Sequence, residues 1–133
     1  AFLVAVTSSA RASELAALDC RPAFTTVRSQ FVSLKHNEVF QPKVPSSTNV
    51  ERTINLQAFR SKSCPVRAIV KYLELSGKVR QPPLSQLFVT YAKGRQGRKV
   101  HPPTISRWLV SAIKGAYEAD GRPAPQISGH STR

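Results

Sequence analysis

Apolar residues recur at helical spacing in two long segments of the chain. The first begins at Pro65, which suits the first turn of a helix, and Gly77 offers a C-terminal stop. Its apolar face consists of Val66, Ile69, Val70 and Leu73. The second follows His101 and ends at Gly121, with an apolar face made of Ile105, Trp108, Leu109, Ala112, Ile113 and Ala116. The pattern predicts two amphipathic helices whose apolar faces, Trp108 included, lie in the core.

The first 18 residues predict two shorter helical pieces. Thr7, Ser8 and Ser9 separate them, and their hydroxyls are suited to cap the second piece. This places Arg11 in the first turn of that piece. Because the helix dipole disfavours a cation there, we interpret Arg11 either as a residue near a bound anion or as a solvated surface arginine.

Between these helical segments the pattern changes to short β-rich runs. Residues 31–34, 39–43 and 52–56 predict a small antiparallel sheet, and Pro42 makes the second run an edge strand. A further short strand is expected within residues 84–91. The fold class predicted is therefore α+β, mainly helical with a small antiparallel sheet, in a single domain over residues 1–133.

The charge of the chain points to a polyanionic partner. Lysine and arginine number 20 against 7 acidic residues, for a net charge of +13, and they are spread along the whole sequence. Nucleic acid fits this distribution better than a membrane surface, because no segment forms a long basic amphipathic helix and residues 1–6 are too short to span a bilayer. No membrane partner is expected.

One glycine-punctuated loop concentrates this charge. Lys93, Arg95, Arg98 and Lys99 lie within seven residues that also include Gly94 and Gly97. We interpret these four cations, with Arg107 on the following helix, as contacts to a DNA backbone. A solvated turn is the alternative interpretation.

Common catalytic motifs are missing. The sequence has no GxxxxGK[ST], GxGxxG after a strand, HExxH or GxSxG, and its carboxylates are scattered. Cys20 and Cys64 are isolated, so we expect reduced thiols, no metal site and no cofactor. What remains is metal-free phosphate chemistry, in which arginine and histidine donors stabilise charge on phosphate. Arg11, His130 and Arg133 are suited to it, and if a helix begins at His130 the spacing of the last two puts them on one face of it.

The chain resembles the tyrosine recombinases, specifically those of DIRS-like retroelements. Arg11-Ala12-Ser13-Glu14-Leu15 is similar to the helix that carries the family's first catalytic arginine, and His130-Ser131-Thr132-Arg133 is similar to its His-x-x-Arg pair. Lys43, in Phe40-Gln41-Pro42-Lys43-Val44, matches the lysine of the family's β-hairpin. Ile105-Ser106-Arg107-Trp108-Leu109-Val110 looks like the retroelement branch. The matches follow the family's order along nearly the whole chain.

The resemblance implies a role for each matched residue. Arg11 and Arg133 would clamp the scissile phosphate, His130 would donate a hydrogen bond or shuttle a proton, and Lys43 would be the general acid towards the leaving oxygen. Lys35 is the alternative to Lys43. The implied activity is DNA breaking and rejoining during integration or recombination, by a homo-oligomer assembled on DNA. Such a protein is nuclear if it comes from a eukaryotic retroelement, and otherwise cytoplasmic.

The family's nucleophilic tyrosine follows the His-x-x-Arg pair, whereas Tyr72, Tyr91 and Tyr117 all precede His130. We therefore expect an incomplete catalytic domain that lacks both the helical DNA-clamping domain and the nucleophile segment, and that is inactive by itself as a strand transferase. The alternative hypothesis is a non-catalytic basic module that binds DNA or RNA through charge alone.

Overall fold

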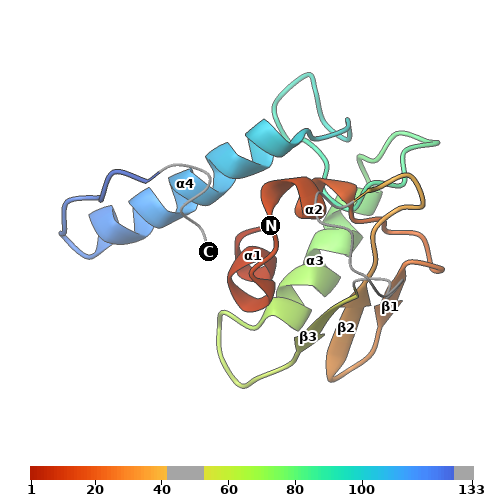
Figure 1. The fold of residues 1–133 in the computed structure, drawn as a ribbon, viewed down its shortest axis with the longest axis horizontal. Helices are drawn as coiled ribbons and strands as arrows, with labels where there is room; N and C mark the ends of the chain where they lie inside the picture. The colour runs from red at the N-terminus through yellow and green to blue at the C-terminus, as the bar shows by residue number, and fades with distance from the viewer. Residues whose placement is uncertain (42–52, 128–133) are drawn as a thin grey trace.

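The computed structural model describes residues 1–41 and 53–127 (Figure 1). Two short helices, α1 (Phe2–Ser8) and α2 (Ala12–Ala17), precede the strands β1 (Thr25–Val27), β2 (Phe31–Leu34) and β3 (Ile54–Gln57). Helices α3 (Pro65–Gly77) and α4 (Pro102–Ala119) follow. The described residues confirm the predicted combination of helices with a small antiparallel sheet.

The three strands form one antiparallel sheet in the order β1-β2-β3. Val32 lies opposite Leu56 and Leu34 lies opposite Ile54, and all four side chains are buried. The intervening Ser33 and Asn55 form a hydrogen bond of 2.5 Å on the other face. This alternation explains why the run at residues 31–34 was predictable, because every second side chain must reach the core.

Three strand predictions need correction. β1 was not predicted, because Thr25–Val27 is a three-residue segment whose last two side chains are exposed. The run at residues 39–43 is not a strand in its described part, since residues 39–41 form a turn and coil. Residues 84–91 contribute only two isolated bridges, Gln86 with Asp19 and Val89 with Lys99. Leu87, Phe88 and Val89 are buried, and the backbone bonds to residues 18–20, Leu87 N–H to the Leu18 carbonyl at 2.7 Å and Cys20 N–H to the Ser85 carbonyl at 2.8 Å, form a single bridge and not a strand.

Helix α3 packs against β2 and β3, and α1 packs against β3 and α3, so that the two helices close the core over one face of the sheet. Pro65 opens α3 and Gly77 is its last residue, as the sequence predicts. Val66 and Ile69 on this helix are buried, whereas Val70 remains 44% exposed. The core also takes in the chain before α4, through the buried side chains of Leu87, Phe88 and Val100.

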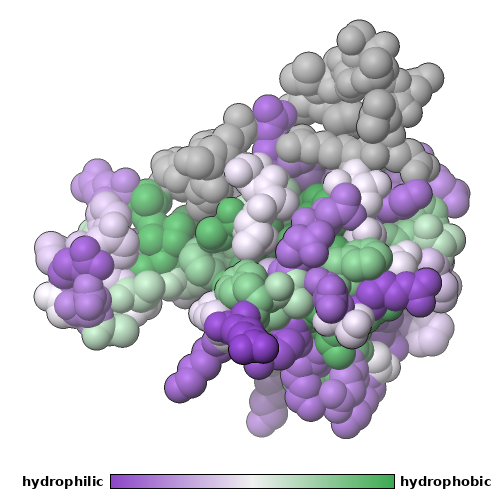
Figure 2. Space-filling view, turned by 90° about the horizontal axis from the view of Figure 1, so that it is seen from below, coloured by the Kyte–Doolittle hydropathy of each residue, from purple (hydrophilic) through white to green (hydrophobic). Residues whose placement is uncertain are grey.

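Helix α4 packs against α2 and α1, and its buried residues lie in its N-terminal half. Ile105 and Leu109 are buried and Trp108 packs against the core, but Ala112 and Ala116 are exposed. The prediction that this whole apolar face lies in the core is therefore wrong for its C-terminal half. That half projects from the domain, and hydrophobic residues show at its surface beside a hydrophilic tip (Figures 1 and 2).

Two buried polar side chains tie the segment before α4 to the rest of the domain. The Gln86 amide donates to the carbonyls of Ala16 and Val100, and its oxygen accepts the Val100 N–H at 3.0 Å. Asp19, 1% exposed, accepts hydrogen bonds from Arg21 and from the Ser85 hydroxyl at 2.8 Å. These bonds fix where the chain leaves the core and enters the basic loop, defined here as residues 93–99.

Candidate functional site

Arg11 is the N-cap residue of α2 and not a member of its first turn, which corrects the sequence-based expectation. Its backbone N–H donates to the Glu14 carboxylate at 2.6 Å. The predicted serine caps are used elsewhere, because Ser8 donates to the Val4 carbonyl at 2.6 Å and Ser9 ends α1 in the left-handed conformation. Glu14 thus holds the backbone of Arg11, whose side chain is half-buried.

Lys35, the alternative catalytic lysine, lies directly after β2 and is half-buried. Its N–H donates to the Phe24 carbonyl at 2.8 Å, and its carbonyl accepts the Asp19 N–H at 3.2 Å. Asp19 follows the C-terminal end of α2, while Arg11 stands at the N-terminal end. A six-residue helix is about 9 Å long, so the backbones of Arg11 and Lys35 lie at opposite ends of α2, separated by about that length.

The other three residues of the expected clamp lie outside the described part of the chain. Lys43 belongs to residues 42–52, and His130 and Arg133 belong to residues 128–133. The choice between Lys43 and Lys35, and the pairing of Arg11 with Arg133, therefore stay predictions.

The basic loop is a turn closed by hydrogen bonds. The N–H of Thr90 donates to the Arg98 carbonyl at 3.0 Å, and the N–H of Gly97 donates to the Thr90 carbonyl at 2.8 Å. The Thr90 hydroxyl adds a bond to the Arg95 carbonyl. Because its ends are joined in this way, the loop presents exposed side chains from a fixed base. These are Lys93, Arg95, Arg98 and Lys99.

Gly97 holds this loop against the domain. It is buried and has a φ of +72°, and a Cβ on it would lie 1.7 Å from the backbone oxygen of Val79. Only glycine permits both this conformation and this approach. Gly94 has a similar φ of +74°, but a Cβ on Gly94 would meet no heavy atom within 4 Å, so only its conformation calls for glycine.

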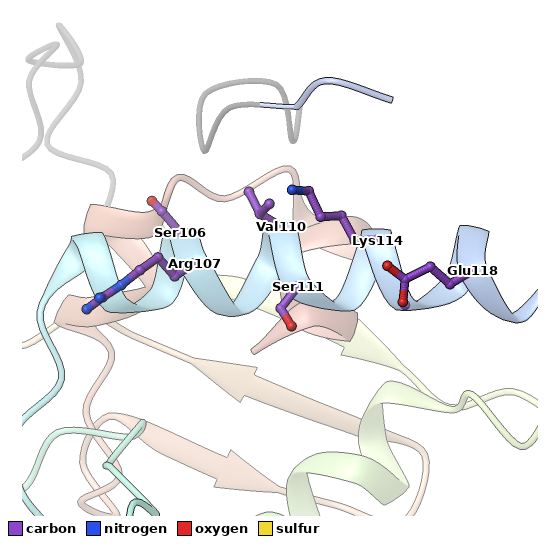
Figure 3. Close-up of a pocket in the computed structure, with 7 residues that line it drawn as sticks. Ser106, Arg107, Val110, Ser111, Lys114 and Glu118 are labelled. Carbon is purple, nitrogen blue, oxygen red and sulfur yellow. The ribbon is translucent and has the colours of Figure 1, made fainter. Parts of the chain in front are cut away.

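Arg107 and Lys114 extend the cationic surface along α4. Both are exposed and line a shallow groove with Ser106, Val110, Ser111, Gly115 and Glu118. Their side chains extend toward the N-terminal end of the helix, where the basic loop joins it (Figures 1 and 3). The Arg107 guanidinium donates to the Thr104 hydroxyl at 3.2 Å.

The carboxylates that the structure describes do not neutralise the basic loop. In the described ranges, ion pairs join Asp19 to Arg21, Glu74 to Lys71 and Asp120 to Arg122. None of the carboxylates in these same ranges pairs with Lys93, Arg95, Arg98 or Lys99. The four cations of the loop therefore face solvent with their charge available to an external anion.

The tyrosines differ in what their hydroxyls can do. Tyr72 accepts the Val89 N–H at 2.8 Å, and burial raises the pKa of its phenol above the ordinary value. The ring of Tyr117, on α4, lies beneath the guanidinium of Arg122. Tyr91 is 45% exposed and lies two residues before the basic loop. Sequence reasoning assigned no role to Tyr91, although its position just before the cluster of cations was visible.

Cys20 and Cys64 are free thiols. No group of three histidine, cysteine, aspartate or glutamate side chains suited to a metal ion occurs in residues 1–41 and 53–127. Across those ranges, too, no helix has the length and apolar character needed to cross a membrane.

Comparison with known proteins adds no relative to this picture, because no protein-family model, curated protein or solved structure matches the chain.

Proposed function

We propose that this chain binds DNA as part of the catalytic domain of a tyrosine recombinase of the DIRS-like type. The observation that carries the proposal is the order of elements around Arg11. An arginine at the start of a helix is followed by antiparallel strands whose connection contains Lys43, and a long helix then precedes His130 and Arg133 in the sequence. The recombinase resemblance requires this order.

The charges suggest a division of labour. Arg11, with Lys43, His130 and Arg133, would bind the phosphate at which a strand is cut, where arginine forks neutralise developing charge without a metal. The basic loop and Arg107 would contact backbone phosphates away from that point. Lys35, near α2, would take the role of general acid towards the leaving oxygen if Lys43 does not.

In this proposal the chain binds DNA but does not carry out strand transfer by itself. Tyr72 is fixed in the domain by its bond to Val89, and no tyrosine follows His130 in this sequence. We expect a suicide DNA substrate, which traps covalent intermediates, to yield no covalent adduct with the 133-residue chain. An adduct through Tyr72, Tyr91 or Tyr117 would contradict the assignment.

Fluorescence anisotropy with a labelled DNA duplex tests the binding site. Removing a charge-assisted contact to phosphate costs about 1.5–3 kcal/mol, so Arg11→Ala should weaken binding roughly tenfold or more. Arg11→Lys should recover only part of the affinity, since an ammonium cannot bind phosphate bidentately. Arg28→Ala is the matched control, because Arg28 is exposed between β1 and β2 and should change affinity less than about twofold.

The comparison with the loop decides between the two hypotheses. If Arg11→Ala weakens duplex binding no more than Arg95→Ala or Lys99→Ala, Arg11 has no special role and the chain acts as a basic binding module. If no variant in either group changes the affinity, neither group of residues contacts the DNA and both hypotheses are wrong about the binding surface, whereas no measurable binding by the unchanged chain would refute DNA binding itself.

A further inference from the structure

Tyr91 presents an aromatic ring that is both exposed and braced. It is 45% exposed, and its ring contacts that of Tyr72 edge-on, with centroids 6.1 Å apart and planes at 61°. The Tyr72 ring in turn lies 5.5 Å from that of Phe88, which is buried. The Tyr91 ring is thus held from the domain side.

The brace is fixed by hydrogen bonds as well as by packing. The Val89 N–H donates to the Tyr72 hydroxyl at 2.8 Å, and Val89 forms a bridge with Lys99 across the base of the loop. Tyr91 follows Val89 by two residues. Its position is therefore coupled to the segment that anchors the cations.

The cations of the basic loop follow Tyr91 in both arms of the turn. Lys93 and Arg95 follow Tyr91 closely, and Arg98 and Lys99 return beside it, because Thr90 is paired with Arg98. An aromatic platform beside several phosphate-binding cations is the arrangement that binds single-stranded nucleic acid, in which bases stack on the ring and the backbone follows the charge.

We infer that Tyr91 and the basic loop form a subsite for an unpaired base of single-stranded DNA. The inference rests on the proposed DNA-binding function and names the form of DNA that this part of the surface selects. In a duplex each base is covered by its neighbours, so the Tyr91 ring can act only where a strand is open. The cations contribute to the binding of single-stranded and duplex DNA, whereas the Tyr91 ring contributes to the binding of single-stranded DNA alone.

Three labelled probes distinguish contacts to bases from contacts to phosphates. The first is a thymidine strand of about 20 nucleotides, the second is a strand of equal length made of abasic sites, and the third is a blunt duplex. Anisotropy titrations at one salt concentration compare the unchanged chain with Tyr91→Ala, Tyr91→Phe and Phe59→Ala. Phe59 is 48% exposed between β3 and α3 and serves as the matched aromatic control.

We expect Tyr91→Ala to lose affinity only for the single strand that carries bases. Tyr91→Ala should weaken binding of the thymidine strand by about fivefold or more, while binding of the abasic strand and the duplex changes less than about twofold. Tyr91→Phe should bind like the unchanged chain, because stacking needs the ring and not the hydroxyl. Phe59→Ala should have no effect.

Two results would overturn the inference. One is equal binding of the thymidine strand by Tyr91→Ala and the unchanged chain. The other is an equal loss on all three probes, which would mean that the substitution disturbs the loop. In either case continued duplex binding that depends on Arg11 leaves the proposed function standing, whereas absence of duplex binding would remove the proposed function itself.

Discussion

Gly97 lies against the backbone of Val79 so closely that a Cβ on Gly97 would fall 1.7 Å from the Val79 oxygen. Val79 follows α3, and Gly97 belongs to the basic loop. This contact joins the loop to the end of a core helix, and it explains how a segment rich in cations keeps a defined position.

Gly97→Ala should therefore displace the loop, whereas Gly94→Ala should not. A left-handed conformation costs a non-glycine residue about 1–2 kcal/mol, and both substitutions incur that cost. Only Gly97→Ala adds a collision with backbone. Urea unfolding should show a loss of about 1 kcal/mol for Gly94→Ala and a clearly larger loss for Gly97→Ala, with weaker duplex binding for the latter alone. Equal losses in the free energy of unfolding would mean that the loop moves to accommodate the added Cβ without further destabilising the protein.

Gln86 should be a stability determinant out of proportion to its size. Gln86→Leu removes the partners of the Val100 carbonyl and N–H, which are buried, and of the Ala16 carbonyl, which is partly buried. Each such group costs about 1–3 kcal/mol, so unfolding should become easier by roughly 3 kcal/mol or more. Gln81→Leu, at an exposed position, is the control and should change stability by less than about 0.5 kcal/mol. A similar small value for Gln86→Leu would show that water replaces the amide.

Asp19 should make stability depend on pH. Burial raises the pKa of Asp19, but hydrogen bonds from the side chain and backbone of Arg21 and from Ser85 together outweigh burial, so that the pKa lies below the ordinary value. A depressed pKa in the folded state stabilises the protein above the unfolded-state pKa of about 3.9, and this contribution is lost as the pH falls through the folded-state pKa.

Asp19→Asn should accordingly reduce the free energy of unfolding at pH 7, by about 1–3 kcal/mol, and the difference from the unchanged chain should shrink below about pH 4. Urea unfolding across this pH range measures it. Glu118→Gln, on the exposed surface of α4, should show little difference at any pH. A gap between Asp19→Asn and the unchanged chain that stayed constant down to about pH 2 would argue against the charge as its cause.

The basic loop should account for part of the salt dependence of DNA binding. Each phosphate contact contributes about one unit to the slope of log affinity against log salt concentration, so the double variant Arg95→Ala, Lys99→Ala should lower the slope by about two. The double variant Arg60→Ala, Lys62→Ala removes the same charge from an exposed segment between β3 and α3. Its slope should change by less than about one, and equal slopes for the two double variants would mean that overall charge alone drives binding.

Local rules predicted most of the helices and part of the sheet. Pro65 and Gly77 bound α3 as expected, and the alternation of Val32 and Leu34 marks β2. The same rules failed at residues 84–91, where buried Leu87 and Phe88 suggested a strand. An apolar run predicts that a segment is buried, but this segment pairs with its neighbours only through isolated bridges, which are too short to make a strand.

The site was predictable in residue type more than in geometry. The cations of the basic loop were identified from charge density, and their exposure follows from the cost of burying a charge. The N-cap position of Arg11 was not identified, because whether Glu14 or a serine hydroxyl bonds the first N–H groups depends on bonds that compete in three dimensions.

The sequence by itself determined the amphipathic faces, the strong positive charge and the clustering of cations before α4, since these are properties of residue order and composition. Only the tertiary structure decided that Gly97 anchors the loop on Val79, that Tyr91 is braced by Tyr72, and that half of the apolar face of α4 stays outside the core. Each of these depends on which distant segments meet, and packing between segments far apart in the chain leaves no local pattern.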